Sequence, residues 1–113
     1  MRKPNHDPTL TVLNFNPQIK GVGRYFPVRV MRWEGSLWLL SKDAEAALGW
    51  SYGTLTAHLS TRLPGDAWGY ANVLTERGRE LLRFVSLAGL KATVTRTRDR
   101  QSWAFRRWLH TLA

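Results

Sequence analysis

Residues 28–40 read VRVMRWEGSLWLL and decide the fold expected for this 113-residue chain. The two valines alternate with Arg29 and Met31, which is the two-residue period of a half-buried β-strand. Glu34-Gly35 then supplies a tight turn, and residues 37–40 continue as a second apolar strand. This stretch therefore predicts a β-hairpin.

Two tryptophans, Trp33 and Trp38, flank the predicted turn on opposite strands. Aromatic pairs across neighbouring strands stabilise hairpins, so packing of one ring against the other is the favoured interpretation. Stacking of nucleobases on these rings is the alternative.

The sequence after the hairpin changes to a helical period. Ser41 is a favourable N-cap residue, and Asp43 and Glu45 would place negative charge in the first helical turn. Alanines and a leucine at i, i+3 and i+4 form an apolar stripe over residues 44–48. Gly49 follows as a residue suited to ending the helix.

Further elements are expected along the rest of the chain. A second helix is predicted from Ser51 until Leu63-Pro64-Gly65 ends it. The period then returns to two on either side of residues 75–79, which predicts a second hairpin with that segment as its tip. Apolar residues at i, i+3 and i+7 over 87–94 predict a helix, and residues 105–112 carry the clearest amphipathic stripe.

These patterns together predict an α+β fold. The expected architecture is a small single domain of two β-hairpins, forming an antiparallel sheet, packed with about four short α-helices. Residues 1–12 contain two prolines and no clear periodicity, so they are interpreted as a loose N-terminal arm. Residues 13–113 are assigned to the domain.

The charge of the chain points to a polyanionic partner. There are 17 Lys and Arg against 8 Asp and Glu, a formal net charge of +9, and most of the basic residues are arginine. Arginine pairs in a bidentate manner with phosphate and with guanine edges, whereas lysine acts as a point charge. No cysteine is present and no apolar run approaches the length of a membrane span, so neither disulfides nor a membrane partner is expected.

The sequence offers little for catalysis or metal binding. His6, His58 and His110 lie in separate segments without a partner at ligand spacing. No nucleophile motif or dinucleotide fingerprint is present. We therefore expect no enzymatic activity, no metal and no cofactor.

The basic residues gather in the last third of the chain. Asp99 is the one acid in the stretch 96–107, which is otherwise suited to gripping phosphates. A solvated helix face is the alternative interpretation of this stretch. The residues expected to bind nucleic acid are Arg96, Arg98, Arg100, Arg106 and Arg107, with Arg77 and Arg79 at the tip of the second hairpin as a second contact.

Two functions remain open from these residues alone. The first is a nucleic-acid-binding module, and the second is a protein-binding module that seizes an acidic protein, since Trp and Arg dominate protein interfaces. The surroundings of Trp103 distinguish the two functions, because this residue lies off the apolar stripe of its helix. Apolar surroundings would favour a protein partner, whereas surrounding arginines would favour stacking on nucleic acid. A homodimer is compatible with either function.

Three segments, in order, resemble the Bro-N domain, which begins many phage and prophage antirepressors and the baculovirus repeated-ORF proteins. Residues 27–30, PVRV, and 35–50, GSLWLLSKDAEAALGW, resemble its hairpin and first helix. Residues 82–90, LRFVSLAGL, are similar to its "v-x-F-I-s-E-x-G-L-Y" pattern, and residues 102–109, SWAFRRWL, to its "A-x-x-F-r-r-W-V" pattern. The resemblance covers residues 13–112.

The resemblance implies an α+β domain that binds double-stranded DNA in a transcriptional regulator of the phage antirepressor type. It also implies a possible repressor protein as partner and a cytoplasmic location in the bacterial host of a phage or prophage. The chain departs from the family at Leu87-Ala88, where an acid is usual, at Lys91, where an aromatic is frequent, and at Thr97-Arg98. Family members continue into a second, effector domain, so a truncated chain and a stand-alone domain are both compatible with the sequence.

Overall fold

A computed structural model describes residues 9–19, 25–55, 57, 67–94 and 99–112 of the chain. Strands and helices follow one another in the order expected of an α+β fold, with two hairpins and helices after each. The elements are β1 (Thr11–Phe15), β2 (Phe26–Trp33), β3 (Ser36–Leu40), α1 (Ser41–Leu48), β4 (Trp68–Thr75), β5 (Gly78–Ser86), α3 (Leu87–Thr93) and α4 (Arg100–Leu109).

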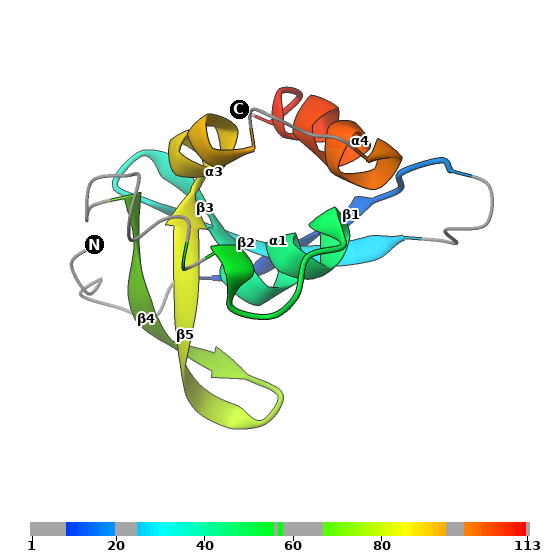
Figure 1. Cartoon of the computed structure of the whole chain (residues 1–113). Coiled ribbons are helices and arrows are strands. Elements are labelled where there is room, and N and C mark those ends of the chain that lie inside the picture. The colour runs from blue at the N-terminus through cyan, green and yellow to red at the C-terminus, as the bar shows by residue number, and fades with distance from the viewer. Residues whose placement is uncertain (1–8, 20–24, 56, 58–66, 95–98, 113) are drawn as a thin grey trace.

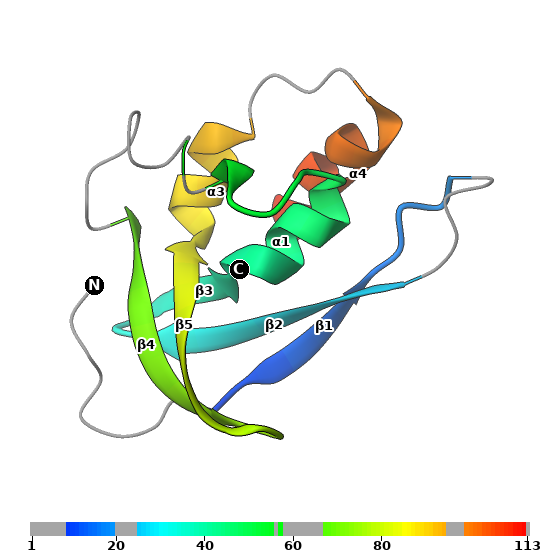
Figure 2. The same ribbon diagram turned by 60° about the horizontal axis from the view of Figure 1, so that its bottom comes forward.

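The five strands form one antiparallel sheet in the order β1-β2-β3-β5-β4. The three helices lie together over one face of this sheet, as Figures 1 and 2 show. The main core lies between the sheet and the helices and joins strand residues such as Val28 and Leu39 to helix residues such as Leu48, Leu90 and Phe105. These five side chains are fully buried, so the helical layer is fixed on the sheet.

The first hairpin is confirmed. Strands β2 and β3 pair with Met31 opposite Trp38, and the turn residues Glu34 and Gly35 both have a positive φ, of 50° and 76°. Two left-handed residues give the type of turn that suits the twist of a two-residue hairpin. The rings of Trp33 and Trp38 pack edge to face with their centroids 6.0 Å apart, as the packing interpretation requires.

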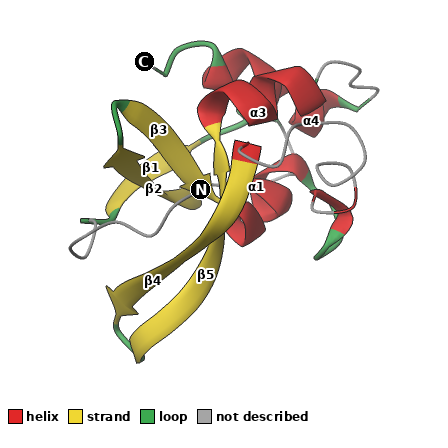
Figure 3. Ribbon diagram, turned by 90° about the vertical axis from the view of Figure 1, so that its left-hand side faces the viewer, coloured by secondary structure: helices red, strands yellow, loops and turns green. Residues whose placement is uncertain are grey.

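The second hairpin extends beyond the sheet as a two-stranded ribbon. Strand β5 pairs with β4 over residues 78–85, but with β3 only at residues 84–86. The remainder of the β4–β5 hairpin therefore projects away from the helices, as Figure 3 shows. The inner face of this ribbon packs against Met31 and Trp38 and forms a second, smaller core, to which it contributes the buried side chains of Ala71, Val73 and Phe84.

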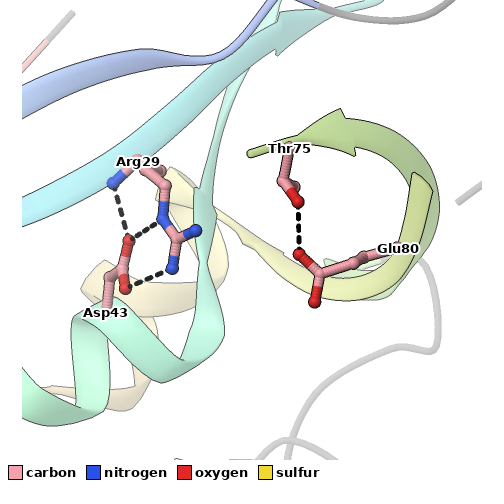
Figure 4. A network of polar contacts seen from close by, with 4 residues as sticks. All are labelled: Arg29, Asp43, Thr75 and Glu80. Carbon is pink, nitrogen blue, oxygen red and sulfur yellow. Dashed lines mark hydrogen bonds and ion pairs between the residues drawn. The ribbon is translucent and has the colours of Figure 1, made fainter. Parts of the chain in front are cut away.

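A polar link holds α1 on the sheet. Asp43 Oδ2 accepts hydrogen bonds from the backbone N–H and the Nε of Arg29, both at 2.9 Å, and Oδ1 accepts one from Nη2 at 3.1 Å (Figure 4). The hydrogen bonds to Asp43 raise the pKa of Arg29 above its ordinary value. The positive charge of Arg29 is therefore paired with Asp43 inside the domain. In the ribbon, Thr75 Oγ1 donates a hydrogen bond to Glu80.

The start of α1 differs from the prediction. The capping position is held by Leu40, the last residue of β3, because the strand runs directly into the helix. Ser41 is not the N-cap: its hydroxyl is buried and has no hydrogen-bond partner within the part of the chain described. Glu45 lies beyond the first turn, is buried, and accepts a hydrogen bond from the backbone N–H of Leu55 at 2.9 Å. At the other end, Gly49 has φ 76° and ends the helix as predicted.

Two further elements differ from the expected arrangement. Strand β1 begins at Thr11, inside the segment interpreted as a loose arm, and its alternating inward residues Leu13 and Phe15 join the main core. The helix predicted from Ser51 falls largely outside the described residues, which hold three complete helices where about four were expected. No helix among the described residues is long and apolar enough to cross a membrane.

Candidate nucleic-acid interface

Helix α4 begins at a side-chain cap. Asp99 Oδ1 accepts a hydrogen bond from the backbone N–H of Ser102, and Oδ2 accepts one from the Ser102 hydroxyl, both at 2.8 Å. Because the backbone hydrogen bond from Ser102 favours the carboxylate, the pKa of Asp99 lies below its ordinary value of 3.8. The one acid of the Arg-rich stretch is thus used to start the helix.

The first turn of α4 holds the end of α1. Gln101 Nε2 donates to the carbonyl oxygens of Ala46 and Ala47, at 3.3 and 2.9 Å. The Ser102 hydroxyl, whose single proton is shared with Asp99 Oδ2, lies 3.2 Å from the carbonyl oxygen of Leu48. The last carbonyls of a helix lack partners within it, so these contacts supply partners for Ala47 and Leu48, whereas the carbonyl of Ala46 also accepts from the backbone N–H of Gly49. The contact fixes the position of α4 along α1.

The inner face of α4 is anchored by aromatic packing. Phe105 and Leu109 are fully buried. The ring of Phe105 meets that of Phe15 edge to face at 5.2 Å, and Trp108 lies 5.4 Å from the same ring. The stripe predicted from the sequence is therefore the buried face of α4, and it determines which residues point outwards.

The outer face of α4 carries the cationic residues. Trp103 is 49% exposed, and the guanidinium carbon of Arg107 lies 4.8 Å from the centroid of its ring. Trp103, Arg106, Arg107 and His110 line a shallow hollow on the surface. Arg100 is exposed one turn before Trp103, on the side of the helix that also carries Arg107. Helix α4 contains no acidic residue.

The predicted DNA-binding residues do not form one surface. Arg77 lies in the turn of the ribbon and Arg79 at the start of β5, whereas α4 lies at the far side of the molecule in Figures 1, 2 and 3. Arg100, Arg106 and Arg107 are brought together on α4. Arg96 and Arg98 lie outside the described residues.

His110 is a residue of this surface that the sequence argument set aside. It was considered only as a metal ligand, for which it lacks a partner. Its position three residues after Arg107 and seven after Trp103 places it on the same face of a helix, and it lines the same hollow. The helical spacing from Trp103 and Arg107 was the sequence signal that could have placed His110 on this surface.

Comparison with known proteins adds no relative: no family model matches the chain, and no curated protein or solved structure is significantly similar to it. The Bro-N resemblance therefore stays a prediction.

Proposed function

We propose that this protein is a DNA-binding module that grips the phosphate backbone of double-stranded DNA through the outer face of α4. The observation that carries the proposal is the pair Trp103 and Arg107, an exposed indole with a guanidinium 4.8 Å from its ring centroid. Arg106 and His110 complete the surroundings of the indole in the hollow. This is a cationic setting for an exposed aromatic ring, which suits a polyanion that also presents flat bases.

The rigidity of α4 supports this assignment. Its capped first turn and buried inner face fix the backbone that carries the arginines, and Arg107 already lies over Trp103, so binding orders fewer groups. With a net charge of +9 the whole chain also attracts a polyanion, and α4 gives that attraction a defined point of contact.

The alternative function, capture of an acidic protein through Trp103, fits the surface less well. An apolar surround would favour such a partner, whereas the other residues that line the hollow are Arg106, Arg107 and His110. We therefore favour nucleic acid as the partner of α4.

The proposal extends to the class of regulator. The order of a β-hairpin, then α1, and a C-terminal helix bearing Arg106-Arg107-Trp108 is the order that the Bro-N resemblance implies. We infer a transcriptional regulator of the phage antirepressor type, acting in the cytoplasm of a bacterial host.

Fluorescence anisotropy with a labelled random duplex tests the proposal. The triple variant R100Q/R106Q/R107Q should bind at least about tenfold more weakly than the wild type, because hydrogen bonds to charged groups contribute about 1.5–3 kcal/mol each. The double variant R77Q/R79Q measures the ribbon separately, and K42Q controls for the loss of an exposed charge elsewhere. Wild-type affinity in the triple variant, with an unchanged circular dichroism spectrum, would refute the role of α4.

A further inference from the structure

Strand β4 is an edge of the sheet with unusual composition. Among the described strands it has β5 on one side and no neighbour on the other. Its eight residues, WGYANVLT, include no charged residue and no proline. Proteins ordinarily protect long edge strands with charges, prolines or bulges, because an open row of backbone N–H and C=O groups pairs readily with another strand.

Two of the three exposed side chains of β4 are also largely apolar. Tyr70 is 45% exposed and Leu74 is 64% exposed, with the exposed amide of Asn72 between them on the same face. Strand β1, the opposite edge, has only five residues and one large exposed apolar side chain, Val12. Strand β4 is therefore the edge that offers both the longer backbone and the more exposed apolar surface.

We propose that β4 pairs antiparallel with β4 of a second copy of the chain, about a two-fold axis at Asn72. In this register Tyr70 lies opposite Leu74 of the second copy, and Leu74 opposite its Tyr70. Asn72 faces its own equivalent, and amide side chains both donate and accept hydrogen bonds. Each of the three exposed residues of the strand therefore meets a compatible one, which a two-fold interface requires.

The distribution of charge favours a second copy at this place. Two chains of net charge +9 repel each other, and β4 is a surface on which they can meet without opposing charges. Among the described residues, the cations nearest on that face are Arg79 and Arg83, which lie in β5 opposite Leu74 and Tyr70. In the dimer, the backbones of Arg79 and of Arg83 of the second copy would stand three strand spacings, about 14 Å, apart. The guanidinium of Arg83 lies over the ring of Tyr70, 5.8 Å from its centroid, so part of the repulsion between the copies remains and is screened by salt.

The dimer would join the two sheets into one continuous sheet and place two α4 surfaces in one particle. The inference rests on the edge of β4 and stands independently of what α4 binds. It also predicts that raising the salt concentration strengthens the association, because the residual repulsion between the copies is screened.

Sedimentation velocity of the full chain over a range of concentrations tests this pairing. The wild type should form a dimer, and Leu74→Lys should raise its dissociation constant at least about tenfold, because it places a cation at the interface of a basic protein. Leu81→Lys is the matched control: Leu81 is 59% exposed on the same face but lies in β5, so the dimer should persist. Val12→Lys tests the β1 edge in the same way.

A cysteine variant gives a second measurement, since the chain contains no cysteine of its own. Asn72→Cys should form a covalent dimer on mild oxidation, whereas Leu81→Cys should not, because only position 72 meets its equivalent across the axis. A monomeric wild type at every concentration would overturn the proposal. The proposal would also be overturned if Leu74→Lys and Leu81→Lys raised the dissociation constant of the dimer equally. The same holds if Val12→Lys were the one variant of the three that dissociated it.

Discussion

The guanidinium of Arg107 lies over the indole of Trp103, with 4.8 Å between the guanidinium carbon and the ring centroid. The two residues are four apart on α4, so the helix itself holds the charge over the ring. Both side chains are exposed, and the contact is a cation–π interaction of about 0.5–1 kcal/mol at such a site. Its main consequence is for binding, because a cation already held in position loses less freedom when it meets a phosphate.

Substitutions of Arg107 separate its charge from its shape. Arg107→Gln should weaken binding to a random duplex by about tenfold or more, since one phosphate contact is lost. Arg107→Lys keeps the positive charge and should retain most of the affinity if the contact is to the phosphate backbone. The measurement is a fluorescence anisotropy titration at fixed salt. Equal losses in both variants would instead indicate a bidentate contact with a base edge.

A substitution of Arg100 should weaken DNA binding without lowering the stability of the domain. It is an exposed cation in the first turn of α4, where the helix dipole disfavours positive charge. Arg100→Ala should therefore weaken DNA binding while leaving the melting temperature unchanged or about 1–3 °C higher. Calorimetry and the binding titration on one sample check both effects. A melting temperature several degrees lower would show that Arg100 has a structural role.

The cap of α4 should make the stability of the domain depend on pH. Asp99→Ala removes the acceptor of the Ser102 hydrogen bonds and should cost about 1 kcal/mol of unfolding free energy, or roughly 4 °C in melting temperature. The folded pKa of Asp99 lies below its ordinary 3.8, so its stabilising effect is complete above about pH 5. The effect is lost as the pH falls through the folded pKa.

Urea unfolding of the wild type and Asp99→Ala at a series of pH values measures this difference. The gap in unfolding free energy should be constant near neutral pH and shrink below about pH 4. Asp99→Asn is the matched control, because an uncharged residue that also caps helices should show a smaller loss near neutral pH, and its own capping contribution does not change with pH. A gap that widens in acid would contradict the assigned role.

The junction between α4 and α1 can be tested at Gln101. Its amide nitrogen donates to the carbonyl oxygens of Ala46 and Ala47, so Gln101→Glu would place a carboxylate oxygen against two acceptors. We expect Gln101→Glu to lower the unfolding free energy by about 1–2 kcal/mol, more than Gln101→Ala, which only removes the donor. Chemical denaturation at neutral pH measures both. Equal effects of the two variants would show that the hydrogen bonds contribute little to docking.

Elements with strong local patterns could be predicted from the sequence. The first hairpin followed from alternating residues around Glu34-Gly35, and both left-handed turn residues are where that pattern placed them. The buried face of α4 followed from the spacing of Phe105 and Leu109. In both cases neighbours in the sequence are sufficient to define the element.

Features that depend on tertiary packing were missed. Thr11–Phe15 is a strand because it pairs with β2. The two prolines in the preceding residues favoured a loose arm, and the alternating pattern is too short to indicate a strand against them. Ser41 was expected to cap α1, but the direct passage from β3 into α1 gives that position to Leu40. The distance between the ribbon arginines and α4 also depends on the order of strands in the sheet, which no local pattern specifies.

The dependence of DNA affinity on salt tests the central role of α4 most directly. Between about 50 and 200 mM salt, log K of the wild type on random duplex DNA should fall against log salt with a slope near −5, as for about six neutralised phosphates. In R100Q/R106Q/R107Q three of those contacts are lost, so the slope should become about −2 to −3. A flat wild-type curve, or a wild-type slope in the triple variant, would contradict the account.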